Sequence, residues 1–348
     1  MAKLRYRLEK ATDTKKATKY FLVRSASFKG KHNKVRQYLG TTEPTAEDLA
    51  KAIRDYAYDL EMKAAEKVAE IAAEYYTADY LSEPVIKELE RLRFLHNTYM
   101  SSLNKTELEV YEQQYDSIYV HGTTAIEGNT LTLRETHYLI NEGIVPKSKS
   151  LREINEVQNY LKVRAYSQQY KGRVTLKFIR ELHSLIMDNI DLEMAGTFRK
   201  TDNVRIAGCG LSVGLAATIE LDLKDLIDQY YENIKAKKHP FEQVILLHHR
   251  FEKIHPFMDG NGRTGREMLN YMLEKTGYPR LIIPKEAREA YLSAMDYGDQ
   301  ELLGKKGQTS EMVKVFAELM LTGYELELAD IKNVIIPRGQ TKLEDFRE

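Results

Sequence analysis

The densest group of chemically active side chains lies in residues 254–266, IHPFMDGNGRTGR. An imidazole, a carboxylate and two guanidinium groups surround a Gly-Asn-Gly turn there, and they belong to His255, Asp259, Arg263 and Arg266. An imidazole can take a proton near neutral pH, a carboxylate can hold Mg²⁺, and the planar fork of arginine binds phosphate oxygens in pairs. Together they form the set of groups that phosphoryl or nucleotidyl transfer requires.

The backbone of this segment predicts an anion-binding site. Pro256 disfavours helix for the residue before it, so one helix should end near His255 and the next should begin at about Arg263. The turn between them, residues 260–262, places successive N–H groups at a helix N-terminus, where anions bind. Cations gain nothing from the helix dipole at that end, so Arg263 and Arg266 indicate a bound polyanion. A nucleoside triphosphate fits this description best.

A metal-dependent hydrolase is the alternative interpretation of this region. It would rest on four histidines: His239, His248, His249 and His255. The adjacent His248 and His249 face different sides of a helix, and no acidic residue completes a zinc spacing such as His-Glu-x-x-His. The spacing therefore favours the polyanion site over a zinc site.

A second short motif, HGTTAIEGNTLTL (residues 121–133), places a carboxylate directly before a glycine. From residue types alone, Thr123 to Glu127 is a short helical turn that Gly128 ends, because glycine readily takes left-handed backbone angles. On this interpretation Glu127 is an ordinary solvated side chain at a helix end.

The elements that must position these groups are mainly helices. Residues 45–76 and 82–102 have apolar side chains at three- and four-residue spacing, and Pro84 suits a first helical turn. Capping boxes predict helix starts at Thr45/Asp48, Thr106/Glu109, Thr132/Glu135 and Ser150/Glu153. Further helices are expected at about 175–189, 218–236, 240–254, 263–276, 285–297 and 310–328.

Two segments have strand patterns instead. Residues 19–28 and 34–40 are rich in Tyr, Phe, Val and Leu around the turn KGKHN, and they predict an N-terminal hairpin. Residues 197–214 combine β-branched side chains with a glycine cluster and predict a short hairpin inserted among helices.

The N-terminal hairpin is basic. Residues 1–40 contain twelve Lys and Arg and two acids, a net charge of +10 in a chain whose total is zero. Such asymmetry suggests either an acidic partner such as nucleic acid or a solvated basic surface, and we favour the solvated surface.

Length and composition are those of a globular protein. With 348 residues, of which 43% are hydrophobic and 30% charged, the chain can bury a substantial core. Its one cysteine, Cys209, excludes an internal disulfide and fits a reducing compartment. The first residues lack the apolar stretch of a secretion signal, and no apolar run approaches the roughly 20 residues that span a bilayer. We therefore expect a cytoplasmic protein with no membrane partner.

The segment HPFMDGNGRTGR resembles the signature of the Fic family, His-Pro-Phe-x-(Asp/Glu)-Gly-Asn-Gly-Arg-x-x-Arg, at every defined position. Family-like features surround it: LREINEVQNY (151–160), GTFR (196–199), EKTGYP (274–279) and REAYLSAM (288–295). The resemblance covers about residues 105–300, the expected Fic domain. The residue patterns outside it predict a basic β-hairpin segment (1–44), a helical region (45–104), and a C-terminal helix and tail (301–348).

The resemblance implies a mainly α Fic fold, a helical bundle with a small β-hairpin flap. It also implies transfer of AMP from ATP to a Ser, Thr or Tyr hydroxyl of a target protein and of the chain itself, with release of pyrophosphate. His255 would be the general base and Asp259 would hold Mg²⁺. The phosphates would be bound by Gly260, Asn261, Gly262, Arg263 and Arg266. The flap, which would align the target by strand-like pairing, would be formed by Val204, Arg205, Ile206 and Ala207.

Two further positions take a role from the resemblance. Tyr291 matches a position near the adenine, and an ordinary core aromatic is the equal alternative. Thr123-x-x-x-Glu127-Gly128 resembles the family's inhibitory motif, (Ser/Thr)-x-x-x-Glu-(Gly/Asn), in the variant that precedes the Fic core. It implies that Glu127 pairs with Arg266 and holds the α-phosphate of ATP out of line, so the enzyme would be autoinhibited.

Other functions stay open at this point. Some relatives use this glutamate to remove AMP, so one alternative is a Fic-type enzyme of another reaction: a de-AMPylase that acts through Glu127, or a transferase of UMP or another phosphate-linked group. A different class is a nucleic-acid-binding regulator that acts through residues 1–40. Relatives commonly form homodimers, so a dimer is expected by analogy.

Overall fold

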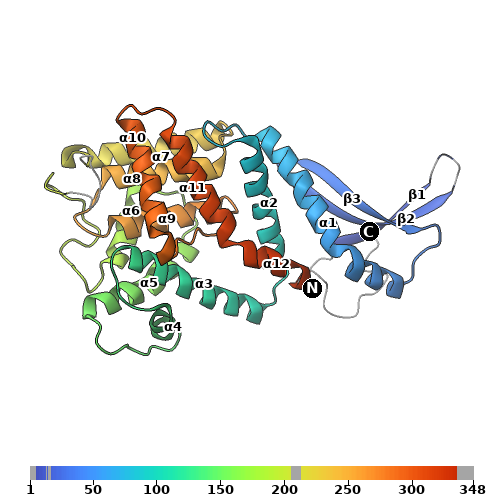
Figure 1. The fold of residues 1–348 in the computed structure, drawn as a ribbon, viewed down its shortest axis with the longest axis horizontal. Coiled ribbons are helices and arrows are strands. Elements are labelled where there is room, and N and C mark those ends of the chain that lie inside the picture. The colour runs from blue at the N-terminus through green and yellow to red at the C-terminus, as the bar shows by residue number, and fades with distance from the viewer. Residues whose placement is uncertain (1–4, 13, 15–16, 205–212, 335–348) are drawn as a thin grey trace. The chain divides into compact units, whose positions relative to one another are not determined.

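The computed structural model of the chain describes residues 5–12, 14, 17–204 and 213–334 (Figure 1). In these ranges the fold is mainly α-helical with one small antiparallel sheet, which confirms the predicted fold class. The chain forms two compact units. The first comprises Met1–Thr77, Ser82–Lys105 and Leu321–Glu348, and the second comprises Ala78–Leu81 and Thr106–Met320.

The sheet of the first unit has three strands: the predicted N-terminal hairpin is confirmed, and a third strand that was not predicted joins it. β2 (Thr18–Phe28) pairs with β3 (Lys31–Gly40) as expected, and β1 (Tyr6–Thr12) pairs with the other side of β2. In β1 only alternate residues, including Tyr6 and Leu8, belong to the core, and charged residues separate them. Because charged residues alternate with the apolar ones, the composition of this segment did not predict a strand.

One face of the sheet packs on the long helix α1 (Ala46–Tyr75). Leu22 of β2 shares a core with Leu49 and Leu60 of α1, and each of these side chains is at most 1% exposed. Burying one such aliphatic side chain contributes about 1.5–3 kcal/mol, so this core holds sheet and helix together.

Much of the basic charge of the sheet is paired within the first unit. Lys34 and Arg36 lie 3.0 and 2.5 Å from the carboxylate oxygens of Glu9. Arg24 donates to the Glu61 carboxylate of α1 at 2.7 Å. Glu9 is already counted in the net charge of residues 1–40, but Glu61 lies outside them, so its pair with Arg24 lowers the uncompensated charge of the sheet.

Two more helices complete the first unit. α2 (Glu83–Met100) has Pro84 in its first turn, as predicted, and packs on α1. α12 (Glu325–Val334) packs on α2, where His96 Nδ1 and Glu327 Oε1 lie 2.7 Å apart.

The second unit is a helical bundle. Its helices are α3 (Lys105–Ile126), α4 (Leu133–Asn141), α5 (Leu151–Gln169), α6 (Leu176–Ile186), α7 (Ile219–Lys235), α8 (Pro240–Ile254), α9 (Asn261–Lys275), α10 (Arg288–Leu302) and α11 (Gln308–Gly323). α8 packs against α7 and α9, and α6 packs against α5, α7 and α9. The loop that joins α8 to α9 is thus held between packed helices (Figure 1).

Most predicted helix boundaries agree with the structure. The capping boxes Thr45/Asp48, Thr132/Glu135 and Ser150/Glu153 are present. The fourth box was wrong, because α3 begins at Lys105 and Thr106 therefore lies inside its first turn. The single helix expected at 310–328 is two helices, α11 and α12, separated after Gly323. Glycine is a poor helix former, which makes it a natural place for this break.

The predicted flap falls largely outside the described residues. Arg205, Ile206 and Ala207 belong to the segment 205–212, which the structure does not describe. Val204 precedes that segment, and no strand is assigned to the described residues 197–204. The hairpin interpretation of this segment therefore stays a prediction.

Candidate active site

The loop between α8 and α9 is shaped by two left-handed backbone positions. α8 ends at Ile254, as Pro256 predicted, and His255 has φ +50°. Gly260 has φ +75° and turns the chain directly into α9, which begins at Asn261 rather than near residue 263. A left-handed angle costs a residue with a side chain on the order of 1–3 kcal/mol, so contacts must hold His255 in place.

Arg199 supplies those contacts. Its buried side chain donates from Nε to the carbonyl oxygen of His255 at 2.7 Å and from Nη2 to that of Ile254 at 3.1 Å. Its backbone N–H donates to the carbonyl of Pro256 at 2.9 Å. Arg199 belongs to the GTFR segment, but nothing in the sequence indicated that it fixes the loop backbone.

His255 has the protonation state of a general base. Burial lowers its pKa below the ordinary value of about 6.5, so the ring is neutral near pH 7. Nδ1 lies 3.2 Å from the carbonyl oxygen of Glu252. This contact assigns the ring proton to Nδ1, and it leaves the lone pair of Nε2 to accept a proton.

Asn261 braces the loop from inside. Its side-chain Oδ1 accepts from the backbone N–H of Phe257 at 2.8 Å, and Nδ2 donates to the Phe257 carbonyl at 2.9 Å. The ring of Phe257 is fully buried, as expected of an anchor. The amide group of Asn261 is therefore used by the loop itself.

A buried histidine that the sequence interpretation missed joins the loop to α6. His183 Nε2 lies 2.9 Å from the carbonyl oxygen of Asp259, and Nδ1 accepts from the Gly196 N–H at 2.9 Å. The ring stacks on Phe257 with centroids 3.6 Å apart. Burial lowers the pKa of His183 to about 4, which keeps it neutral and able to make both contacts.

The structure brings together Arg266 and the segment that resembles the inhibitory motif. Arg266 Nη2 donates to Glu127 Oε1 at 2.7 Å and to the Thr123 carbonyl at 3.0 Å, and Nε donates to Thr123 Oγ1 at 2.8 Å. Burial alone would lower the pKa of Arg266, but the Glu127 carboxylate raises it, so the guanidinium stays charged.

The Glu127 carboxylate also lies on the first turn of α9. A Cβ at Gly262 would overlap Glu127 Oε1 and would lie 2.9 Å from Arg266 Nη1. Glu127 thus lies beside the first turn of α9, close to the positive end of a helix, where anions are attracted. It follows the last residue of α3, and Gly128 has φ +97°, as expected of a helix-ending glycine.

The other motif arginine, Arg263, is paired separately. Its side chain is 6% exposed and lies 3.2 Å from Glu156 Oε1 and 3.5 Å from Asp259 Oδ1. Asp259 also accepts from Arg152 Nη2 at 2.5 Å. Burial alone would raise the pKa of Asp259, but Arg263 and Arg152 more than offset it, and the pKa lies below its usual range.

Tyr291 lies behind Arg266. It is 3% exposed, its ring centroid is 5.9 Å from Arg266 Cζ, and its hydroxyl is 3.0 Å from His248 Nε2. It is therefore a core aromatic in contact with the site, and its proposed place near the adenine stays a prediction.

The other histidines do not assemble a zinc site. Burial lowers the pKa of His248 to about 3, and His249 Nε2 lies 2.9 Å from Asp299 Oδ1. Among the residues that the structure describes, no three His, Cys, Asp or Glu side chains stand where they could share a metal ion.

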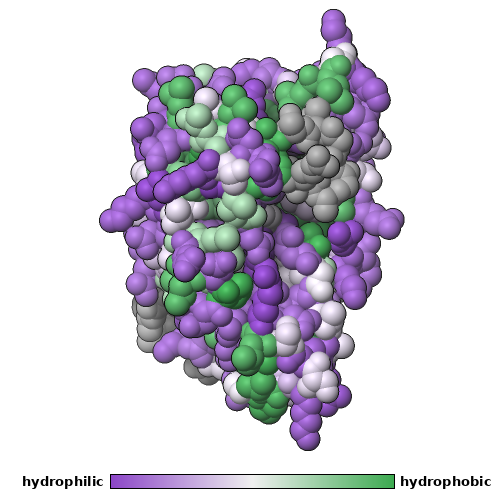
Figure 2. Space-filling model, turned by 90° about the vertical axis from the view of Figure 1, so that its left-hand side faces the viewer, coloured by the Kyte–Doolittle hydropathy of each residue, from purple (hydrophilic) through white to green (hydrophobic). Residues whose placement is uncertain are grey.

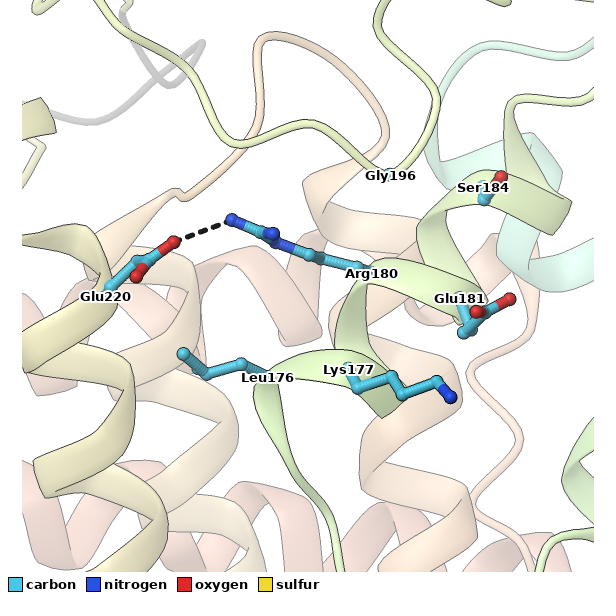
Figure 3. Close-up of a pocket in the computed structure, with 7 residues that line it drawn as sticks. All are labelled: Leu176, Lys177, Arg180, Glu181, Ser184, Gly196 and Glu220. Carbon is cyan, nitrogen blue, oxygen red and sulfur yellow. Dashed lines mark hydrogen bonds and ion pairs between the residues drawn. The ribbon is translucent and has the colours of Figure 1, made fainter.

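A hollow of about 400 Å³ lies beside α6 (Figure 3). It is lined by Leu176, Lys177, Arg180, Glu181, Ser184, Gly196 and Glu220. Arg180 Nη2 donates to Glu220 Oε1 across it at 2.6 Å.

The surface seen from the left-hand side of Figure 1 is mixed in character. Figure 2 shows separate groups of apolar side chains among hydrophilic ones on that face. Across the described part of the chain, no helix combines the length and the apolar character needed to cross a membrane.

Comparison with known proteins agrees with this geometry. Residues 173–273 match the model of the Fic/DOC family. A Fic domain containing signaling protein from Bacteroides thetaiotaomicron superposes with a TM-score of 0.60 at 25% identity, over 70% of this chain and 97% of that chain. Fic-1 (residues 134–508) from Caenorhabditis elegans has the same fold, with a TM-score of 0.60 at 24% identity over 84% and 90% of the two chains. Residues 173–273 of the chain therefore form a Fic domain.

Curated relatives are named for one activity. The chain is 28% identical over 271 residues to protein adenylyltransferase fic-1 of Caenorhabditis elegans, which covers 76% of this chain and 51% of that protein. It is 32% identical over 195 residues to protein adenylyltransferase Fic of Drosophila willistoni, which covers 55% and 37%. The chain thus spans about half or less of the length of these relatives.

Proposed function

We propose that this protein is an autoinhibited adenylyltransferase, which transfers AMP from ATP to a Ser, Thr or Tyr hydroxyl of a target protein and of itself. The observation that carries the proposal is the Glu127 carboxylate on Arg266, over the first turn of α9. The site that we propose for the phosphates of ATP holds a carboxylate of the chain itself. Next to it lies the neutral imidazole of His255, which is suited to activate a hydroxyl.

In the proposed reaction, His255 accepts one proton. The target hydroxyl oxygen attacks the α-phosphorus of ATP, and the bond to the pyrophosphate leaving group breaks. The hydroxyl proton passes to Nε2 of His255, the nitrogen that the contact of Nδ1 with the Glu252 carbonyl leaves free. Arg199 keeps the ring in place by holding the backbone of His255.

The phosphates would be bound by the first N–H groups of α9 and by Arg263 and Arg266. Asp259 fits a magnesium ion that arrives with the nucleotide, because it is ionised and its side chain is 43% exposed. A single carboxylate suits Mg²⁺, which keeps several waters and takes its remaining ligands from phosphate oxygens. Bound there, Mg²⁺ would neutralise charge on the phosphates.

Inhibition follows from the position of Glu127. Its carboxylate occupies Arg266 and places negative charge at the N-terminus of α9. ATP that binds beside it would be displaced, and a misplacement of about 1 Å can cost on the order of 10²-fold in rate.

The test is incorporation of label from ATP labelled at the α-phosphate, with a cell lysate as the source of targets. Glu127→Gly should label itself and a target, and Glu127→Gly combined with His255→Ala should label neither. Equal labelling by the wild type and Glu127→Gly would contradict the inhibitory role. UTP and GTP in place of ATP identify the donor.

Removal of AMP is a second candidate activity. The Glu127 side chain is 38% exposed, so water can reach its carboxylate beside the phosphate site. If this activity exists, the wild type should release AMP from a labelled target faster than Glu127→Gly does. Equal release by the two would exclude it.

The nucleic-acid alternative is less favoured, because the Glu61 carboxylate of α1 neutralises Arg24 of the sheet. If residues 1–40 bind nucleic acid, binding should weaken steeply with salt and should survive His255→Ala. A cytoplasmic location and a homodimer remain proposals as well. Light scattering after size-exclusion chromatography would test the dimer, and microscopy of tagged protein would test the location.

A further inference from the structure

Four charged side chains form a closed ring at the start of α9. Arg152 Nη2 lies 2.5 Å from Asp259 Oδ2, and Asp259 Oδ1 lies 3.5 Å from Arg263 Nη2. Arg263 Nη1 lies 3.2 Å from Glu156 Oε1, which lies 3.3 Å from Arg152 Nε. Two members belong to the motif, and two belong to α5.

The two members from α5 differ in mobility. Glu156 is 8% exposed, and its other oxygen accepts from Asn129 Nδ2 at 2.9 Å. Arg152, four residues earlier on the same helix face, is 56% exposed. Glu156 is therefore fixed, whereas the end of Arg152 can move.

The ring is balanced, with two cations and two anions, as long as no nucleotide is bound. The proposed function requires Asp259 for the metal and Arg263 for phosphate. Once Asp259 has another cation, Arg152 loses its strongest partner and becomes an uncompensated positive charge close to the polyphosphate. A guanidinium group binds phosphate oxygens in pairs and is well suited to that position.

We propose that Arg152 is a third arginine of the nucleotide site, held on Asp259 in the free protein and transferred to the β- and γ-phosphates when ATP binds. This inference rests on the proposed function. Breaking the Arg152–Asp259 pair costs little free energy, because an ion pair in which both side chains are about half exposed stabilises the fold by typically 0–1 kcal/mol. The transfer is favourable, because a triphosphate offers several negative charges in place of one.

The experiment measures the affinity of the Glu127→Gly protein for ATP, ADP and AMP by calorimetry with magnesium present. Arg152→Ala in that background should bind ATP and ADP about 10-fold more weakly and AMP within about 2-fold. Arg152→Lys should recover part of the loss, because it restores the charge without the fork.

Arg180→Ala is the matched control. Arg180 forms a comparable ion pair, 2.6 Å from Glu220 with side chains 45% and 57% exposed, and it lies outside the motif. It should leave all three affinities unchanged.

The outcomes separate the inference from the proposed function. If Glu127→Gly binds ATP and Arg152→Ala matches Arg180→Ala, the inference is wrong and the proposed function stands. If AMP loses as much affinity as ATP, Arg152 acts by shaping the loop, which also overturns the inference. If Glu127→Gly binds no ATP, both fail. Circular dichroism checks that each variant is folded.

Discussion

The two motif arginines, three residues apart on α9, have carboxylate partners of different kinds. Arg266 is paired with Glu127, which lies just beyond the last residue of α3 and is 38% exposed. Arg263 is paired with Glu156, which lies within α5 and is 8% exposed. The carboxylate of Glu127 can therefore move away from α9, whereas the carboxylate of Glu156 is held in place.

This difference separates regulation from support. A carboxylate at a helix end can be displaced by a small local change, whereas one in the middle of a packed helix moves only with the helix. We therefore assign Glu127 to control of the site and Glu156 to its architecture. Substituting the two residues should have different consequences.

The largest expected effect is on rate at Glu127. Glu127→Gly should raise the initial rate of self-labelling by on the order of 10²-fold, because it restores Arg266 and the N-terminus of α9 to the nucleotide. Glu127→Gln, which keeps the size but not the charge, should give a smaller rise. If Gln activates as much as Gly, charge alone accounts for the inhibition.

The next effect is on stability at Glu156. Glu156→Ala leaves Arg263 buried without its nearest counter-charge, and the free energy of unfolding should fall by about 2 kcal/mol. This is less than the loss of a fully isolated pair, because Asp259 stays 3.5 Å from Arg263. Urea denaturation measures the change, and the free energy of unfolding should fall less for Glu127→Gly than for Glu156→Ala. Equal losses at the two positions would remove the distinction between them.

A smaller effect is expected at Thr123. Thr123→Val removes the hydroxyl that accepts from Arg266 Nε and should raise the basal rate about 5-fold, the equivalent of one hydrogen bond. Thr124→Val is the matched control, since that hydroxyl donates to the Val120 carbonyl of its own helix at 2.8 Å. A rise in the control as large as in Thr123→Val would point to a general loosening of α3.

The smallest effect is on pH dependence. The base must be neutral, and burial places the pKa of His255 below about 6.5. The rate of Glu127→Gly should therefore fall only as pH drops below 6.5, and it should change less than about 2-fold between pH 7.5 and 6.5. A rate profile with its midpoint at or above 6.5 would show that His255 is not buried in the working enzyme.

The sequence predicted the features that depend on residues adjacent in the chain, above all the ends of helices. Pro256 predicted the end of α8, and the Ser150/Glu153 capping box predicted the start of α5. Contacts between distant segments carry no such local signal. His183, Arg199 and Glu156 reach the loop from other elements, and nothing beside them in the chain distinguishes them from ordinary core or surface residues.

Two errors have the same origin. β1 was missed because its partner β2, not its own composition, makes it a strand. The start of α9 was placed too late, because the left-handed angle at Gly260 admits Asn261 to the helix directly. Both depend on three-dimensional context that a window of residues does not contain.

Under the proposed function, the last turn of α3 is the part of the chain that must open to release Glu127 from Arg266. Glu127 N–H and Gly128 N–H bond back to the Thr124 and Ala125 carbonyls, and Arg288 Nε donates to the Ile126 carbonyl at 3.0 Å. Helix termini fray readily, so undoing this last turn would free Glu127 without moving the body of the helix. Under the proposed function, a regulator that binds the frayed end of α3 would activate the enzyme, and we expect a low background of modification without that regulator.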